Sequence, residues 1–99
     1  MNNIDLYIVK RGDTLYNIAK KHQMTWQELM KINNKNNTLL SIGEQLIVPG
    51  NAKEIAYYVQ NGDTLFSIAN KFNIDMDYLK ELNNLNTDEV ILGQLITIK

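Results

Sequence analysis

The residues that could support catalysis are few in this chain and do not form a catalytic group. His22 is the only histidine and cysteine is absent, so neither a Ser-His-acid nor a Cys-His arrangement can be built. The carboxylate pairs Asp75/Asp77 and Asp88/Glu89 have the residue types that glycoside hydrolysis needs. They lie at a predicted helix start and in a predicted turn, where acidic residues are common for local reasons. We therefore expect no enzymatic activity, no cofactor and no metal site.

The binding of a ligand is better supported, by a short motif that occurs twice. The stretch Gly12-Asp13-Thr14-Leu15 recurs as Gly62-Asp63-Thr64-Leu65. Each copy follows a β-like run and opens a helix-like run. Glycine lets a backbone approach a ligand closely, and a helix start leaves N–H groups without intrahelical partners. We expect binding at these strand-to-helix corners.

The motif is part of an internal repeat that covers nearly the whole chain. Residues 7–49 align without a gap on residues 57–99, at a period of fifty positions. A repeat of this kind sets the domain organisation. It predicts a first unit over residues 6–49, a linker over 50–56 and a second unit over 57–99.

Composition limits the classes of protein to which the chain can belong. The sequence is 44% apolar and has no apolar run long enough to span a membrane. No secretory signal pattern is present, as would also hold for a fragment or a processed chain. The sequence has neither a phosphate-binding loop nor a basic stripe with interleaved aromatic residues. We expect neither membrane insertion nor nucleic-acid binding.

The net charge of −1 conceals opposite charges on the two halves. Residues 7–49 carry six Lys/Arg and three Asp/Glu, a net +3, whereas residues 57–99 carry three Lys and six Asp/Glu, a net −3. Opposite signs favour contact between the two repeats or self-association. Two separately solvated surfaces are the alternative interpretation.

The first unit should begin with a strand and a short helix, after a polar tail over residues 1–5. Residues 6–10 are rich in β-formers, and Gly12 ends the run. Asp13 is a good N-cap residue for a helix that follows. Its inward face is predicted from the 3.6-residue spacing of Leu15, Ile18, Ala19 and His22.

A second helix should follow over residues 26–32. Thr25 and Glu28 have the spacing of a capping box, and Met24 and Leu29 that of a hydrophobic staple. Turn-forming residues then lead to a strand over residues 46–48.

The second unit should repeat this order. Strands are expected over residues 57–60 and 96–98, and helices are expected to start at the N-caps Asp63 and Asp75. The fold class is therefore α+β: two tandem β-α-α-β units, each a two-stranded antiparallel sheet with two helices packed on one face.

The sequences of both units resemble a known family of domains. The pattern Tyr-x-Val-x-x-Gly-Asp-Thr-Leu-x-x-Ile-Ala, followed by Leu-x-x-Ile/Leu-Asn and Gly-x-x-Leu/Ile-x-Val/Ile, is similar to the LysM (lysin motif) domain in both units. The resemblance implies a β-α-α-β fold and non-catalytic binding of N-acetylglucosamine-containing glycans such as peptidoglycan or chitin. The absence of cysteine and the Asn/Lys-rich composition resemble bacterial members. The family's usual glycine after the first helix is replaced by Gln23 and Asn73.

The resemblance also implies the site. It places the groove between the corner and the loop before the last strand in each unit. The implied glycan-binding residues are Gly12, Asp13, Thr14, Leu15, Tyr16, Leu40 and Ile42, and in the second unit Gly62, Asp63, Thr64, Leu65, Phe66, Val90 and Leu92. Asp13 and Asp63 are interpreted as helix caps more than as ligand contacts, and the side chains of Leu15 and Leu65 as core. Trp26 is expected to pack in the core, because it precedes Leu29 by three positions.

Three functions fit these observations. The first is a carbohydrate-binding module that anchors to the cell wall, with an extracellular or wall-associated location. The second is a protein-interaction or assembly module of a spore coat, phage or envelope structure in which glycan binding is weak or lost, favoured by the apolar stretch 90–92. The third is an accessory part of a larger wall hydrolase.

Overall fold

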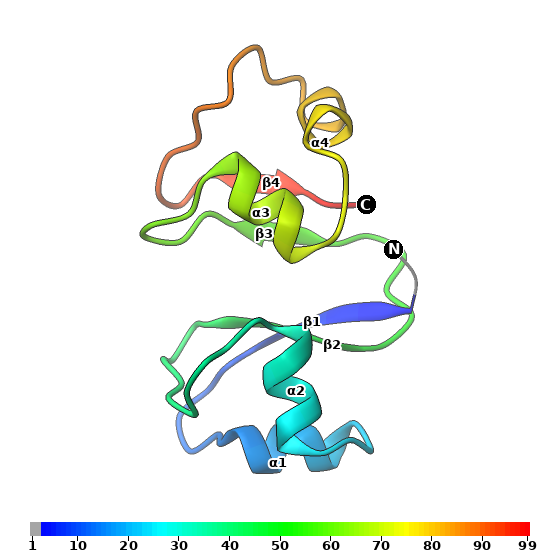
Figure 1. Cartoon of the computed structure of the whole chain (residues 1–99), viewed down its shortest axis with the longest axis vertical. Helices are drawn as coiled ribbons and strands as arrows, with labels where there is room; N and C mark the ends of the chain where they lie inside the picture. Colours follow the sequence, from blue (N-terminus) through cyan, green and yellow to red (C-terminus); the bar gives the residue numbers. More distant parts are fainter. Residues whose placement is uncertain (1–2) are drawn as a thin grey trace. The chain divides into compact units, whose positions relative to one another are not determined.

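A computed structural model describes residues 3–99 of the chain, which fold as two compact units. The described residues up to Ala52 form the first unit and Lys53–Lys99 the second. In chain order the first unit contains β1 (Ile4–Ile8), α1 (Leu15–Lys21), α2 (Trp26–Ile32) and β2 (Gln45–Pro49). The second contains β3 (Ala56–Tyr58), α3 (Leu65–Lys71), α4 (Met76–Leu82) and β4 (Leu95–Thr97). Each unit thus has the expected β-α-α-β order (Figure 1).

Each unit has one two-stranded antiparallel sheet, as predicted. β1 pairs with β2, with Leu6 opposite Ile47, and β3 pairs with β4, with Tyr57 opposite Ile96. In the first unit, α1 and α2 lie on the same side of the sheet (Figure 1). The predicted antiparallel sheets and helical hairpins are confirmed.

The strand boundaries differ from the predicted ones. Ile4 and Asp5 belong to β1, so the expected polar tail is wrong for these two residues; residues 1 and 2 lie outside the described part of the chain. Beyond β1, the N–H of Val9 still donates to Glu44 O, just before the start of β2, and the chain then turns at Lys10. Strand formation therefore depends on the partner strand, which local β-propensity does not reveal.

The four short helices start at side-chain caps. Thr25 and Glu28 form the predicted capping box, with Thr25 Oγ1 accepting from Glu28 N and Glu28 Oε1 accepting from Thr25 N, both at 3.1 Å. Asp75 caps α4 as predicted. Such caps satisfy backbone N–H groups that the first helical turn leaves without partners.

All four helices end in a left-handed residue. After α1, Gln23 has φ 55°, and the N–H of Met24 bonds back to Ala19 O at 3.1 Å. The equivalent residue after α3 is Asn73, also at φ 55°. This is the Schellman ending of a helix, in which glycine or asparagine is usual. Gln23 adopts it at a steric cost that glycine would avoid.

The core of each unit lies between its helices and its sheet. The first core includes the expected Leu15, Ile18, Ala19 and Leu29, together with Val9, Leu46 and Val48. In the second unit the buried apolar residues are Ile55, Tyr57, Val59, Leu65, Ile68, Ala69, Phe72, Leu79, Ile96 and Ile98. Ile55, in the stretch expected as a linker, has a side chain that is 4% exposed and bonds through its backbone to Ile98 and Lys99.

A buried asparagine joins helix to strand in the first unit. The Nδ2 group of Asn33 donates to Leu29 O and Ile47 O, both at 2.9 Å, and its Oδ1 accepts from Ile47 N at 2.6 Å. Asn83 makes the same bonds to Leu79 and Thr97. The asparagines predicted only to end a helix therefore also act as hydrogen-bonding partners for the last strand.

Within the described residues, none of the helices has the length and apolar character required to cross a bilayer.

Candidate functional site

The corner between β1 and α1 is a tight turn. The N–H of Asp13 donates to Lys10 O at 3.1 Å, and Gly12, third in the turn, has φ +87°. A type II turn requires a positive φ at this position, which explains the glycine. No heavy atom would lie within 4 Å of a Cβ built on Gly12, so the backbone here is open. Gly62 holds the equivalent turn in the second unit, at φ +88°.

The carboxylate of Asp13 stabilises this turn and does not cap the helix. Its Oδ2 accepts from the hydroxyl of Tyr7 at 2.7 Å and from the backbone N–H of Lys10 at 2.8 Å. The hydrogen bond from the Lys10 N–H lowers the pKa of Asp13 most, and the bond from the Tyr7 hydroxyl lowers this pKa further below its usual value. The same hydrogen bond raises the pKa of Tyr7. Because the carboxylate is already engaged by these groups, it has less capacity for a ligand.

The N-cap is the following residue, which corrects the prediction for Asp13 and Asp63. Thr14 Oγ1 accepts from Asn17 N at 3.0 Å, and Thr64 Oγ1 accepts from Ser67 N at 3.0 Å. In each motif the acid binds the preceding turn and the threonine caps the helix. The spacing is the reason: a carboxylate three residues after Lys10 or Gln60 can close the turn on that residue's N–H.

A second loop lies beside the corner. The N–H of Gly43 donates to Val9 O at 2.8 Å, and Val9 N donates to Glu44 O at 2.9 Å. These bonds continue the β1–β2 pairing to the loop before β2. Gly43 is the third residue of its own turn, at φ +90°, where Glu44 N donates to Ser41 O at 3.0 Å.

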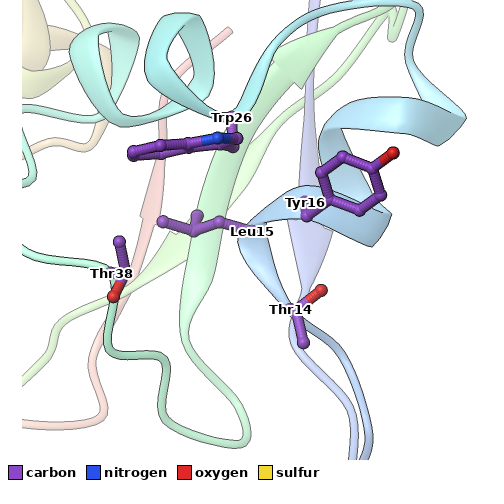
Figure 2. A pocket seen from close by; sticks show the side chains of 5 residues that line it. All are labelled: Thr14, Leu15, Tyr16, Trp26 and Thr38. Atoms are coloured by element: carbon purple, nitrogen blue, oxygen red, sulfur yellow. The ribbon is translucent and has the colours of Figure 1, made fainter.

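A shallow groove of about 330 Å³ opens between the start of α1, the start of α2 and the loop that follows α2. Its lining is formed by Thr14, Leu15, Tyr16, Trp26 and Thr38. Figure 2 shows the Trp26 indole lying above the Leu15 side chain, with Thr14 and Thr38 on either side of that leucine. The groove thus combines two threonine hydroxyls with aromatic surface, and no charged side chain lines it.

The exposure of Trp26 overturns the expectation that it packs in the core. Its side chain is 37% exposed and forms one wall of the groove, although Leu29 is fully buried as expected. Trp26 is the first residue of α2, directly after the Thr25 cap. A residue there lies at the end of the helix, beyond the face that Leu29 buries. The capping box was the available signal for Trp26, and Thr38 lies in the loop before the last strand, which was expected beside the corner.

Four other residues expected at this site do not line the groove: Gly12, Asp13, Leu40 and Ile42. Gly12 and Asp13 form the turn that precedes Thr14, and Leu15 is buried with an edge in the groove. Leu40 is half-buried against the core, whereas Ile42 is 70% exposed at the tip of its turn.

The corresponding surface of the second unit has a different chemistry. A hollow of about 330 Å³ is lined by Asp63, Thr64, Asp88, Glu89, Val90 and Ile91. The carboxylates of Asp88 and Glu89 replace Thr38 and Leu39 of the first unit. Of the other expected residues, Leu65 is buried, Phe66 and Leu92 are exposed, and Gly62 lies in its turn.

Backbone donors at the two corners also differ. Among residues 3–99, the backbone N–H groups of Thr14, Leu15 and Tyr16 donate no hydrogen bond. In the second unit, the Thr64 N–H is satisfied by Ser67 Oγ at 2.9 Å. The first corner therefore has one more free donor than the second.

The candidate catalytic groups have local structural partners. His22 packs edge-on against Tyr7, with ring centroids 6.3 Å apart. Asp75 caps α4, and Asp88 pairs with Lys80 at 2.8 Å. In the described part of the chain, no group of three or more His, Cys, Asp or Glu side chains is placed to hold a metal ion.

The fold and the groove together define a class: small α+β repeat modules with a shallow, mixed aromatic and polar surface at a strand-to-helix corner. The model of the LysM domain family matches residues 7–49 and again residues 57–99. The chain belongs to the LysM family and contains two copies of the domain.

Similar proteins include larger enzymes. The chain is 43% identical over 51 residues to the N-acetylmuramoyl-L-alanine amidase sle1 of Staphylococcus epidermidis, a match that covers 52% of this chain and 16% of that protein. It is 44% identical over 45 residues to the probable peptidoglycan endopeptidase LytE of Bacillus subtilis, a match that covers 46% of this chain and 14% of that protein. The crystal structure of the Bacillus cereus spore cortex-lytic enzyme SleL matches 98% of this chain and 23% of that chain, at 33% identity and a TM-score of 0.46. The chain thus spans less than a quarter of each of these relatives.

Proposed function

We propose that this chain is a non-catalytic module that binds glycans containing N-acetylglucosamine and anchors to the cell wall. Membership of the LysM family supports this proposal. So do the names of two relatives, an N-acetylmuramoyl-L-alanine amidase and a probable peptidoglycan endopeptidase. The observation that carries it is the groove of the first unit, where Trp26 and Tyr16 lie beside the hydroxyls of Thr14 and Thr38.

The chemistry of this groove suits an uncharged amino sugar. A sugar ring has an apolar face of C–H groups, and an acetamido group adds a methyl, so both gain by contact with aromatic surface. The hydroxyls and amide of the same sugar need hydrogen-bonding partners, which the threonines and the free N–H groups of the corner supply. Gly12 and Asp13 would contribute through their backbone, and Leu40 and Ile42 through the neighbouring loop.

The second unit is proposed to bind the same class of glycan more weakly. Its equivalents are Gly62, Asp63, Thr64, Leu65, Phe66, Val90 and Leu92. Two additional carboxylates line the hollow: Asp88 is paired with Lys80, but Glu89 would lose water to a neutral sugar without a cationic partner, which is costly. Peptidoglycan and chitin share the N-acetylglucosamine unit, so the proposal includes both polymers.

Titration of the ¹⁵N-labelled chain with N-acetylglucosamine oligomers of increasing length tests the proposal. We expect shifts to concentrate in residues 12–16, in residues 38–43 and at the indole N–H of Trp26. Trp26→Ala should abolish most of the binding, because it removes one wall of the groove. Tyr78→Ala is the control, since Tyr78 is an exposed aromatic residue outside the groove. Absence of shifts with every oligomer would refute glycan binding.

An assembly module is the second candidate, and one observation favours it. Ile91 and Leu92 are 71% and 70% exposed on the second unit, where the first unit has Ser41 and Ile42. Interaction surfaces are built from contiguous exposed apolar residues, and this pair could contribute to one. Sedimentation of the chain and of Ile91→Ser, which restores the first unit's residue, tests it. Self-association that Ile91→Ser weakens, combined with no retention on purified peptidoglycan or chitin, would favour assembly.

A further inference from the structure

A second hollow adjoins the groove of the first unit and shares two of its residues. It measures about 260 Å³ and is lined by Tyr16, Lys20, Met24, Thr25, Trp26 and Gln27. Tyr16 and Trp26 line both hollows, so the two form one continuous surface across the aromatic pair. A chain of linked sugars that occupied the first hollow would therefore extend towards the second.

The second hollow differs from the first because it contains a cation. Lys20 lies on α1 and is exposed, and within residues 3–99 its ammonium group makes no ion pair. Glu28 follows Trp26 and Gln27 directly in the sequence. Its carboxylate already accepts hydrogen bonds from the N–H and the hydroxyl of Thr25 in the capping box. The Lys20 charge is thus left unneutralised beside an otherwise uncharged lining.

The second unit reverses this charge pattern at the equivalent positions. Asn70 stands in place of Lys20, Asp75 in place of Thr25 and Asp77 in place of Gln27. Its own hollow carries further carboxylates. An anionic ligand would therefore be attracted to the first unit and repelled by the second.

Building on the proposed glycan-binding function, we propose that the hollow at Lys20 is a second sugar subsite of the first unit. It would take a carboxylate-bearing amino sugar linked to the N-acetylglucosamine that the Trp26 groove holds. The Lys20 ammonium would pair with the sugar carboxylate, while the linked ring packs against Tyr16 and Trp26. The first unit then distinguishes an acidic wall glycan from a neutral polymer of N-acetylglucosamine.

The size of this preference follows from the exposure of the charges. An ion pair between solvent-exposed groups contributes little, which corresponds to a preference of about two- to five-fold in affinity. Salt screens such a pair, so the preference should shrink as the ionic strength rises. A preference confined to low salt would therefore match the geometry.

Fluorescence of the full chain can measure the preference, because Trp26 is the only tryptophan and lies between the two hollows. Two peptide-free oligosaccharides of equal length are titrated: one of N-acetylglucosamine alone, and one in which it alternates with a carboxylate-bearing amino sugar. We expect the acidic oligomer to bind about two- to five-fold more tightly at low salt. Equal affinities would overturn the subsite.

Charge variants locate the effect. Lys20→Gln should reduce the ratio of the two affinities to about one, and Lys20→Arg should restore it. Lys31→Gln removes the same charge from α2 outside both hollows and should leave the ratio unchanged. A ratio that Lys20→Gln does not change would refute the role of Lys20. If neither oligomer binds, the glycan-binding function itself fails; if the neutral oligomer binds and the acidic one binds no better, only the subsite fails.

Discussion

The hydroxyl of Tyr7 donates to the carboxylate of Asp13 at 2.7 Å, and this bond ties the sheet to the corner that precedes the groove. Tyr57 and Asp63 repeat it at the same distance in the second unit. The acid also closes its own turn on the N–H of Lys10, so one carboxylate holds both a strand and a turn in place.

Acid should weaken the first unit through Asp13. The N–H of Lys10, followed by the Tyr7 hydroxyl, holds its pKa below the ordinary value of 3.8. The unfolded chain therefore binds a proton more readily than the folded one. The stabilisation is complete above the unfolded pKa and is lost as the pH falls through the lowered folded pKa.

Urea unfolding followed by Trp26 fluorescence, which reports on the first unit, measures this effect. Asp13→Asn should be less stable than the parent chain at pH 7, and the difference should narrow between pH 5 and pH 2. A difference that stays constant over this range would contradict the role of the ionised carboxylate.

Replacement of Asn33 should destabilise the first unit. Asn33→Ala removes three hydrogen bonds and leaves the N–H and C=O of Ile47 without these partners. We expect a loss of about 1–3 kcal/mol in the free energy of unfolding, the usual cost of a buried polar group left unsatisfied. Asn36→Ala, at an exposed position, should change it by less than about 0.5 kcal/mol. Similar effects of the two substitutions would show that the contacts of Asn33 do not stabilise the strand.

Glycine at position 23 should stabilise the first unit. Gln23 has φ 55°, a conformation that costs a side chain with a Cβ about 1–2 kcal/mol. Gln23→Gly should recover about 1 kcal/mol of this cost. The gain is reduced by the loss of the weak hydrogen bond from Gln23 Nε2 to Lys21 O. Gln23→Asn should recover less, because asparagine tolerates this conformation only in part. Urea midpoints of the three chains give the order, and a destabilised glycine variant would contradict it.

A long glycan should bind the intact chain more tightly than either unit alone. Each groove is shallow, so a single site should be weak. Two sites on one polymer gain from their effective concentration when the linker allows both to bind. Isothermal titration with short and long N-acetylglucosamine oligomers, on the chain and on its separated units, measures the gain. If the long oligomer bound the intact chain no more tightly than it bound one separated unit, this result would show that only one unit binds.

Local sequence was sufficient to predict the architecture because the features that determine it are close together in the chain. The capping box of Thr25 and Glu28 spans three residues, and the glycines mark turns whose geometry requires a positive φ. Because the chain is a repeat, most of these features occur twice, once in each unit. Where these local signals agreed, the predicted helices, sheets and apolar core positions were confirmed, whereas His22, also predicted to face inward, is only half-buried.

The groove depended on contacts that no local pattern contains. Whether Asp13 caps a helix or binds Tyr7 is decided by the strand that brings the tyrosine to it, and the groove exists because folding brings Thr38 to the same hollow as Trp26. The sequence by itself determined the two repeats, their secondary structure and the inward faces of their helices, since these follow from short-range periodicity and capping. Only the tertiary structure decided which polar groups are already bonded and which aromatic surface stays exposed, because hydrogen bonding and burial depend on residues that meet through folding.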